Sequence, residues 1–496
     1  MISGQGDMDD PVEVELKLEY ERVHRDRLAG SALLDAQGAE RKHLIATYFD
    51  TPDLRVHSAG YAVRIRKDGE VHVQTVKAST STAGALFVRG EWERTLDGEQ
   101  PILDETAGPL TSCVDPATLG KVEPLFITDV ERLSGLIERD GATIEYSIDS
   151  GEVRAGPRRI ALSEIELELK RGSPQMLFDL ARNLNEEVPL RLGVRSKSGC
   201  GYALVTGGLS SVAKAEPIRL ARDMGAADAF TAIAGSCLKQ YRLNETLLLE
   251  TEAVEAVHQA RVGLRRLRSA FALFKPLFAG DDHAVLLAAE LRWLAGELGA
   301  IRDIDVLLPQ FEGPRRAALA AIRESHFNHL RNLLESGRVR LLPIEIAEWL
   351  AIGSWKAGHQ DRRLHEQMIP VFAANRLDLL RKRIRREGRR LARVDDEHRH
   401  EVRKDAKKLR YVAEFLASLF PGRKAHRRLE HLLDRLEALQ DKLGKLNDMA
   451  AAPELLAQLG LDPEIGARSP KNRTRLLGDA EKCFDALINT KRFWRT

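Results

Sequence analysis

The stretch Val12-Glu13-Val14-Glu15-Leu16-Lys17-Leu18-Glu19-Tyr20 alternates between apolar and charged residues almost along its whole length. Successive side chains of a β-strand point to opposite faces, so the stretch predicts a strand with four charged residues on one face and apolar residues on the other. A charged face is ordinary on a solvated sheet. Whether this charged face is solvated or forms part of a binding site therefore depends on the other strands of the sheet.

The same period of two recurs through the first part of the chain. The polar sets are Arg64 and Arg66, Thr75 and Lys77, Glu91 and Glu93, and Glu164, Glu166, Glu168 and Lys170. Strands are expected near residues 12–20, 43–50, 61–67, 70–78, 86–96, 123–132, 142–154 and 159–170, with turn signals at Lys67-Asp68-Gly69 and Asp149-Ser150-Gly151. Strands at this density predict a closed or nearly closed antiparallel sheet. With helices expected near 22–36 and 174–187, this part is α+β.

Closure of these strands with the charged faces inward would give a lumen that mixes carboxylates with Lys and Arg. The carboxylates could hold Mg²⁺ or Mn²⁺, and the cations could neutralise phosphate oxygens. The same pattern also fits strands whose charged faces point to solvent and pair with one another. Alternation alone leaves both readings open.

The stretch Thr206–Pro217 consists mostly of small and polar residues and ends in proline, which is typical of a domain linker. Beyond it the apolar period becomes helical, in segments near 223–250, 253–278, 283–299, 314–336, 364–393, 397–419 and 424–446. The sequence therefore predicts an α+β domain over 1–206, a linker over 207–219 and an all-α helical-bundle domain over 220–496.

The helical part repeats itself. HQARVGLRRLRSAFALF from His258 aligns with HEVRKDAKKLRYVAEFL from His400, and LGxxRD from Leu298 aligns with LGxxND from Leu443. Two motifs that recur at similar separation predict two related helical halves packed together.

Each repeat carries a basic stripe along one side of its helix. At 3.6 residues per turn the stripe residues fall within an arc of roughly 80°. The stripes consist of His258, Arg261, Arg265 and Arg268, and of His400, Arg403, Lys407 and Arg410. A solvated basic face paired with Asp303, Asp305 or Asp448 is one interpretation. Duplication of the stripe favours the other, a binding surface for a polyanion.

Charge divides the chain in the same way. Residues 1–215 contain 26 Lys and Arg against 35 Asp and Glu, a net charge of −9. The totals of 76 and 74 leave 50 against 39 for residues 216–496, a net charge of +11. The acidic part suits metal ions and the basic part suits a polyanion.

The cysteines indicate neither a zinc site nor a disulfide framework, because no CxxC or Cys/His pair occurs among Cys113, Cys200, Cys237 and Cys483. The N-terminal residues lack the basic and apolar regions of a signal peptide, and no run reaches about 18 apolar residues. We therefore expect a cytoplasmic protein that does not enter a membrane.

The E-x-E-x-K pattern of Glu13, Glu15 and Lys17 resembles the signature of the CYTH family, also called triphosphate tunnel metalloenzymes. The resemblance covers about residues 10–205, through Tyr48-Phe-Asp-Thr51, Arg64-x-Arg66, Lys77, Arg132, Asp149, the Glu-x-Glu-x-Glu strand and Ser196-Lys197-Ser198. It implies an eight-stranded antiparallel β tunnel that binds triphosphates with divalent metal ions.

The same resemblance implies roles for individual residues. The implied metal ligands or water activators are Glu13, Glu15, Asp149, Glu166 and Glu168, with Glu91 as a further candidate. Glu13, Glu15 and Lys17 would be catalytic, and Arg64, Arg66, Lys77, Arg132 and Lys197 would join Lys17 as phosphate ligands.

The two stripes and the LG motifs resemble the CHAD domain, over about residues 220–455. That resemblance implies binding of long-chain inorganic polyphosphate by a basic surface at the junction of two helical halves. The second half has Lys407 and Lys408 where the first has Arg265 and Arg266. Lysine contacts phosphate as a point charge without the bidentate fork of arginine, so we expect binding to be retained.

The joined architecture resembles bacterial CYTH–CHAD proteins and implies an inorganic triphosphatase, which would convert tripolyphosphate to pyrophosphate and phosphate by in-line attack of a metal-activated water. Hydrolysis of thiamine triphosphate, a nucleotide or an RNA 5′-triphosphate is an alternative, as is a non-enzymatic protein that binds or targets polyphosphate. With 5% aromatic residues, the chain is not expected to recognise nucleic acid by sequence.

Overall fold

The computed structural model of this chain describes residues 12–34, 38–69, 71–78, 86–104, 108–209, 211–357, 362–462 and 470–495. The chain forms two compact units. The first comprises Met1–Ala213, Arg242–Thr251 and Asn332–Gly353. The second comprises Lys214–Tyr241, Glu252–Arg331 and Ser354–Thr496.

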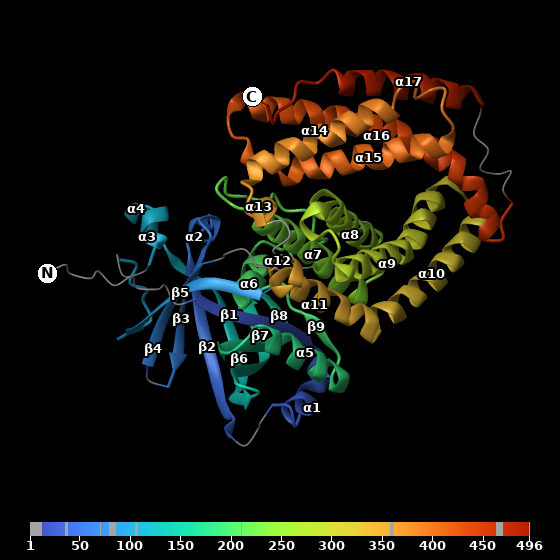
Figure 1. The fold of residues 1–496 in the computed structure, drawn as a ribbon. Helices are drawn as coiled ribbons and strands as arrows, with labels where there is room; N and C mark the ends of the chain where they lie inside the picture. The colour runs from blue at the N-terminus through green and yellow to red at the C-terminus, as the bar shows by residue number, and fades with distance from the viewer. Residues whose placement is uncertain are drawn as a thin grey trace. The chain divides into compact units, whose positions relative to one another are not determined.

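The first unit is built on one antiparallel sheet (Figure 1). Its strands follow the order β5-β4-β3-β2-β6-β7-β8-β1-β9, and β5 also pairs with β1, so β1 to β8 close on themselves. The expected eight-stranded tunnel is confirmed. The strands are β1 (Val12–Tyr20), β2 (Glu40–Asp50), β3 (Tyr61–Asp68), β4 (Val71–Ala78), β5 (Leu86–Leu96), β6 (Glu123–Arg139), β7 (Ala142–Ala155), β8 (Arg158–Arg171) and β9 (Leu190–Leu192).

The register of the strands sets the two faces of the tunnel. On β1 and β8, Lys17 lies opposite Glu166, and Leu16 lies opposite Leu167. Both leucines are fully buried, and α5 (Gln175–Glu187) packs against β1, β8 and β9 on their apolar side. The apolar faces thus point outward to helices, which leaves the charged faces for the lumen.

Short helices cover other parts of the outer surface. The helices α2 (Arg55–Ser58), α3 (Leu110–Cys113) and α4 (Pro116–Leu119) contribute apolar side chains to a core with β2 to β5. Helix α6 (Lys197–Val205) packs against β6, β7 and β8. Its position matters for function, because its first residue is one of the candidate phosphate ligands.

Several expectations for the first unit need correction. Asp149-Ser150-Gly151 is not a turn but lies inside β7, where a Cβ on Gly151 would overlap the carbonyl oxygen of Asp129 on β6. This glycine permits close approach of strands rather than a turn. The helix expected near 22–36 is limited to η1 (Arg22–His24) and α1 (Arg25–Ala29). The three-residue β9 and helix α6 were not predicted.

The second unit is helical. Its main helices include α8 (Val254–Phe274), α9 (Asp282–Leu307), α14 (Ile369–Glu387), α15 (Asp396–Phe415), α16 (Arg423–Gln458) and α17 (Pro470–Ile488). Helices α14 to α17, drawn in orange and red in Figure 1, form one group in which each helix packs against the next along the chain. Helix α8 packs against both α9 and α15. The contact of α8 with α15 brings the two repeats together.

Two helical stretches belong to the first unit although they lie within the range 220–496. They are the end of α7 (Ala226–Glu250), and the end of α10 (Gly313–Glu335) with the whole of α11 (Gly337–Ile352). Arg242 on α7 is 1% exposed and donates to the carbonyl oxygen of Leu192 at 3.0 Å. The compact units are therefore made of separate chain segments and do not coincide with the continuous domains expected from the sequence. Helix α11 was not predicted, because apolar residues on most of its faces obscure the helical period.

Among the helices of the described residues, none is long and apolar enough to cross a membrane.

Candidate functional site

Lys17 lies in the charged lining of the tunnel and is 1% exposed. Its Nζ lies 2.8 Å from Glu164 Oε1 and 3.7 Å from Glu15 Oε1, and it also pairs with Glu166. Burial by itself lowers the pKa of a lysine, but the three carboxylates outweigh it and raise the pKa of Lys17 well above its ordinary value. Lys17 is therefore a permanently charged group.

Lys197 enters the same cluster from a different element. It is the first residue of α6, whose start is capped by the Ser196 hydroxyl accepting from the amide of Gly199 at 3.1 Å. Its Nζ lies 2.7 Å from both Asp149 Oδ2 and Glu166 Oε1. Burial lowers the pKa of Lys197, but the neighbouring carboxylates, Asp149 first, raise it above the ordinary value overall.

Arg132 on β6 supplies the third cation. Its Nε and Nη2 donate to the two oxygens of Asp149 at 2.7 and 2.6 Å, and Nη2 also donates to Glu166 Oε2 at 3.0 Å. Asp149 is fully buried, and burial alone raises the pKa of a carboxyl group. Lys197 and Arg132 overcome this effect, so the pKa of Asp149 is lowered. The pKa of Glu166 is lowered well below its ordinary value for the same reason, with Lys17 as the largest attractive influence.

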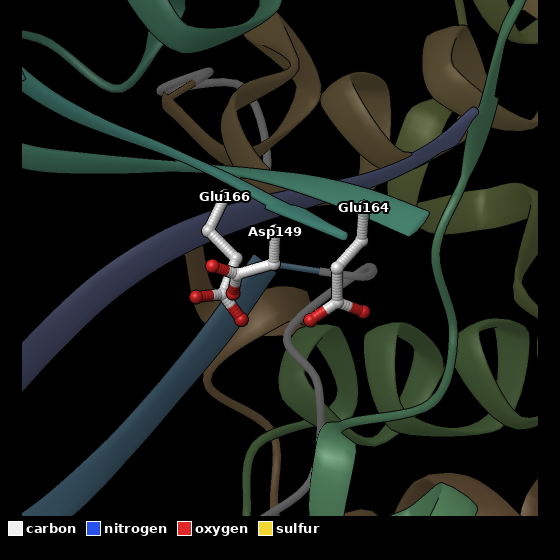
Figure 2. A group of neighbouring side chains, drawn as sticks. All are labelled: Asp149, Glu164 and Glu166. Atoms are coloured by element: carbon white, nitrogen blue, oxygen red, sulfur yellow. The ribbon is translucent and has the colours of Figure 1, made fainter. Parts of the chain in front are cut away.

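Three carboxylates meet at this point. One oxygen from each of Asp149, Glu164 and Glu166 lies within 4.8 Å of the others. Figure 2 shows that the three side chains point to the same side of the sheet from β7 and β8. An oxygen-only donor set with this spacing fits a hard divalent ion such as Mg²⁺ or Mn²⁺. Lys17, Lys197 and Arg132 balance the three negative charges in the ligand-free arrangement.

A second group of charges lies on β3, β4 and β5. Lys77 Nζ lies 2.8 Å from Glu91 Oε2, and Arg64 Nη2 lies 3.7 Å from the other oxygen of Glu91. Thr75 donates to Glu93 Oε1 at 2.8 Å. Members of both groups, including Lys17, Glu166 and Lys197 from the first and Arg64, Lys77 and Glu91 from the second, line one cavity of about 680 Å³. The tunnel thus has a carboxylate-rich side and a side where Arg and Lys predominate.

A separate cavity of about 550 Å³ lies in the helical unit. Six residues of the two basic stripes line it, together with Arg302, Asp303, Asn447 and Asp448. The six are His258, Arg261, Arg265, His400, Arg403 and Lys407. The internal repeat has therefore placed corresponding side chains of α8 and α15 around a common space.

The glycines of the repeated LG motif make room for these arginines. A Cβ on Gly299 would overlap the guanidinium of Arg261, whose Nη1 donates to the carbonyl oxygen of Ala295 at 3.3 Å. At Gly444, a Cβ would meet the guanidinium of Arg403 at 3.9 Å, an ordinary contact. The first glycine thus permits a close approach of the Arg261 side chain, which would have to move away from an alanine, whereas the second glycine permits no such approach.

Comparison with known proteins agrees with this arrangement. The CYTH domain matches residues 12–201 and the CHAD domain matches residues 232–457. The chain contains a CYTH domain followed by a CHAD domain.

Similarity to individual proteins is more limited. An inorganic triphosphatase of Haemophilus influenzae is 31% identical over 159 residues, which are 32% of this chain. The match spans only 45% of that relative's own length. The CHAD domain of the plant Ricinus communis is 27% identical, covering 55% of this chain and 94% of that one, with a TM-score of 0.45. An adenylyl cyclase-like protein of Hippeastrum, described as having dominant triphosphatase activity, is 17% identical over 39% of this chain and 96% of that one, with a TM-score of 0.27.

Most residues proposed for the CYTH site from sequence lie together in its tunnel. Those lining the cavity are Glu15, Lys17, Arg64, Arg66, Lys77, Glu91, Arg132, Glu166, Glu168 and Lys197. Asp149 lies behind the lining and contacts it through Lys197 and Arg132. Glu13 is on β1 opposite Arg89, and its side chain lies outside the described residues.

Glu164 was assigned no role from the sequence, although it is 3% exposed and contacts both Lys17 and Lys197. It could have been found from its position two residues before Glu166 on the same face of β8. Glu164 lies behind the cavity lining, whereas Tyr48, Glu93, Glu145 and Lys170 line the tunnel without an assigned role.

Two stripe residues of the CHAD domain lie elsewhere. Arg268 lines neighbouring cavities rather than the central one. Arg410 is paired along its own helix with Glu414, at 3.1 Å. The two stripes therefore share the central cavity through their first three residues, whereas Arg268 and Arg410 are not part of its lining.

Proposed function

We propose that the CYTH tunnel hydrolyses tripolyphosphate to pyrophosphate and phosphate in the presence of Mg²⁺ or Mn²⁺. The observation that carries this proposal is the convergence of Asp149, Glu164 and Glu166 with Lys17, Lys197 and Arg132 at one wall of a closed lumen. The similarity to an inorganic triphosphatase supports the choice of substrate.

The carboxylates of Asp149, Glu164 and Glu166 would hold the divalent ion, with Glu15 and Glu168 close by in the lining. A bound divalent ion supplies charge neutralisation and lowers the pKa of a coordinated water. Lys17, Lys197 and Arg132 now pair with these carboxylates, and a phosphate would offer them alternative partners. Ion and substrate should therefore bind better together than separately.

On the opposite side of the lumen, Arg64, Arg66 and Lys77 would bind the remaining phosphates. Guanidinium groups form bidentate contacts with phosphate oxygens, which would fix the length and direction of the substrate in the tunnel. A short inorganic chain fits this lining because phosphate offers charge to every basic group and needs no apolar contact.

The test is phosphate release from tripolyphosphate with each metal ion, beside ATP, thiamine triphosphate and an RNA 5′-triphosphate. We expect tripolyphosphate to be the best substrate. Glu166→Gln should lower turnover on the order of 10²-fold or more and weaken Mn²⁺ binding measured by calorimetry. The matched control is Glu131→Gln, an exposed glutamate on β6, which should leave both unchanged. Release from none of the substrates, or full turnover by Glu166→Gln, would refute the proposal.

For the CHAD domain we propose binding of long-chain inorganic polyphosphate in the 550 Å³ cavity. The support is the set of basic side chains from both repeats that line this cavity, against three carboxylates, Asp303, Asp448 and Glu454. We keep the domain limits expected from the sequence, with the CYTH domain over 1–206, a linker over 207–219 and the CHAD domain over 220–496.

We also propose a cytoplasmic location. The four cysteines are free thiols, which suits a reducing compartment.

A further inference from the structure

Lys407 occupies an unusual position among the basic residues of the CHAD domain. It is half-buried on α15, facing Arg261 and Arg265 from α8 and Arg403 from its own helix. Among the described residues, no carboxylate forms an ion pair with its ammonium group. Asp448 on α16 is the carboxylate that attracts it from farther away.

Lys407 and Arg265 also form a wall shared by two cavities. Both residues line the 550 Å³ cavity, and both line a neighbouring cavity of about 690 Å³ that includes Arg268, Arg383 and Lys404. An anion that enters from either cavity would meet the Lys407 side chain. Its position makes it a contact point for a chain that occupies both spaces.

Three guanidinium groups beside a half-buried ammonium group disfavour its charge. Burial is the largest influence, and Arg265, Arg403 and Arg261 add to it, so that the pKa of Lys407 falls to about 6 despite Asp448. Near neutral pH, the side chain in the ligand-free protein is therefore mostly the uncharged amine.

We propose that Lys407 makes anion binding by the CHAD domain proton-linked: its amine takes up one proton from solvent when a phosphate chain enters the cavity. The lone pair on Nζ accepts this proton, and the negative oxygens of the phosphate stabilise the resulting ammonium ion against the three guanidinium groups. This inference rests on the proposed polyphosphate binding. It adds a dependence on pH that the basic stripes alone would not give, because arginine stays charged at every physiological pH.

The sign of the effect follows from linkage. Below about pH 6, Lys407 is already charged and binding needs no proton. Above that pH each binding event takes up as much as one proton, so affinity should fall as pH rises, by up to tenfold per pH unit. A drop of this kind would release polyphosphate as the surroundings become more alkaline.

Other titratable groups face the same space. The pKa of His258 is lowered, mainly by burial and then by Arg302, and His400 shares a hydrogen bond between its Nδ1 and Asn447 Oδ1. The pKa of Asp303 on α9 is raised by burial, and Glu454 on α16 lines the same cavity. In the neighbouring cavity, burial raises the pKa of Asp405 and lowers that of Lys408, and Glu401, Lys404 and Arg383 are also part of the lining. Each of these groups that lacks a proton could also bind one with the anion. Substitution of single residues is needed to separate them.

The internal repeat supplies the decisive variant, because Arg265 of the first half corresponds to Lys407 of the second. Lys407→Arg keeps a cation at this position but removes the exchangeable proton. Calorimetry of long-chain polyphosphate at about pH 7.5, in buffers that differ in protonation enthalpy, measures the protons taken up. Wild type should take up close to one more proton per site than Lys407→Arg, and the variant should bind more tightly at alkaline pH. His258→Gln and His400→Gln should keep the uptake that depends on Lys407.

A second measurement uses the ligand-free protein. An uncharged amine reacts with acetic anhydride, whereas an ammonium ion does not, so Lys407 should be labelled faster at about pH 7 than the exposed Lys404 on the same helix. Polyphosphate should protect Lys407. Polyphosphate binding with the same proton uptake in wild type and Lys407→Arg would overturn this inference alone. Absence of polyphosphate binding would overturn the proposed function and this inference with it.

Discussion

At the residue scale, the functional side of the tunnel depends on a few buried charges that neutralise one another. Lys17 holds its proton because Glu164, Glu166 and Glu15 surround it, and none of these charges could be buried alone at acceptable cost. The cluster therefore serves two purposes. It neutralises the charges that the closed strands bury, and it holds the groups proposed to bind phosphate and metal in place before ligands arrive.

Replacement of this lysine should separate the two kinds of ligand. Lys17→Met removes a phosphate contact but leaves the carboxylates, so tripolyphosphate turnover should fall on the order of 10²-fold while affinity for Mn²⁺ stays the same or rises. Phosphate release and metal titration measure the two effects. Lys121→Met is the control, because Lys121 is exposed and is not among the residues that line the tunnel. Loss of metal binding with normal turnover at saturating metal would mean that Lys17 only supports the carboxylates.

The same charges predict a dependence of stability on pH. A carboxyl group whose pKa is lowered by folding stabilises the protein above its unfolded pKa, and this contribution is lost as pH falls through the folded value. Glu166 and Asp149 are both of this kind. The free energy of unfolding should therefore stay nearly level from about pH 6 to 8 and fall below about pH 5. Denaturant unfolding measures it, and Glu166→Gln should show a shallower fall. A steeper fall in that variant would contradict the lowered pKa of Glu166.

At the scale of the element, the repeated helices differ in how tightly they hold their arginines. Gly299→Ala should push the guanidinium of Arg261 away from α9 and weaken polyphosphate binding severalfold, although alanine favours the helix itself. Gly444→Ala is the matched variant at the corresponding site of the other half. It should leave affinity unchanged, because Arg403 is already at an ordinary contact distance. Binding assays and thermal unfolding of both variants measure these effects. Equal losses of affinity would show that general helix packing, and not the Arg261 position, is responsible.

At the scale of the whole molecule, the uneven charge predicts two separable activities. Reversal of Arg261, Arg265, Arg403 and Lys407 to Glu should abolish long-chain polyphosphate binding, because like charges would then line the cavity. Tripolyphosphate hydrolysis should remain close to that of wild type. Wild-type affinity for the long chain should also fall steeply with salt, as counterion release requires.

Two measurements on wild type and the fourfold variant test this separation of activities. They are the affinity for long-chain polyphosphate at two salt concentrations and the turnover of tripolyphosphate. Circular dichroism and thermal unfolding would serve as the check on folding. Retained and salt-insensitive binding by the folded fourfold variant would rule out the CHAD cavity as the binding site. A parallel loss of turnover would show that the two domains are energetically coupled.

The sequence by itself determined the local features of this protein. A period of two along Val12–Tyr20 and seven similar segments was enough to predict eight strands and their charged faces, because side-chain alternation is a property of each strand alone. The repeat of the His258 segment at His400 likewise predicted two related helical halves. Short or uniformly apolar elements such as β9 and α11 were missed, since they are too short or too evenly apolar to show a period.

Only the tertiary structure decided which of these charges meet. Closure of β5 onto β1 and the register of β1 with β8 place Lys17 between Glu164 and Glu166, residues far along the chain, and give Glu164 a role that its local pattern did not require. The same holds for Lys407, whose pKa is lowered first by burial and then by Arg265 and Arg261 on another helix and Arg403 on its own. The physical reason is that periodicity depends on neighbours in sequence, whereas burial and electrostatic energy depend on distances that packing alone sets.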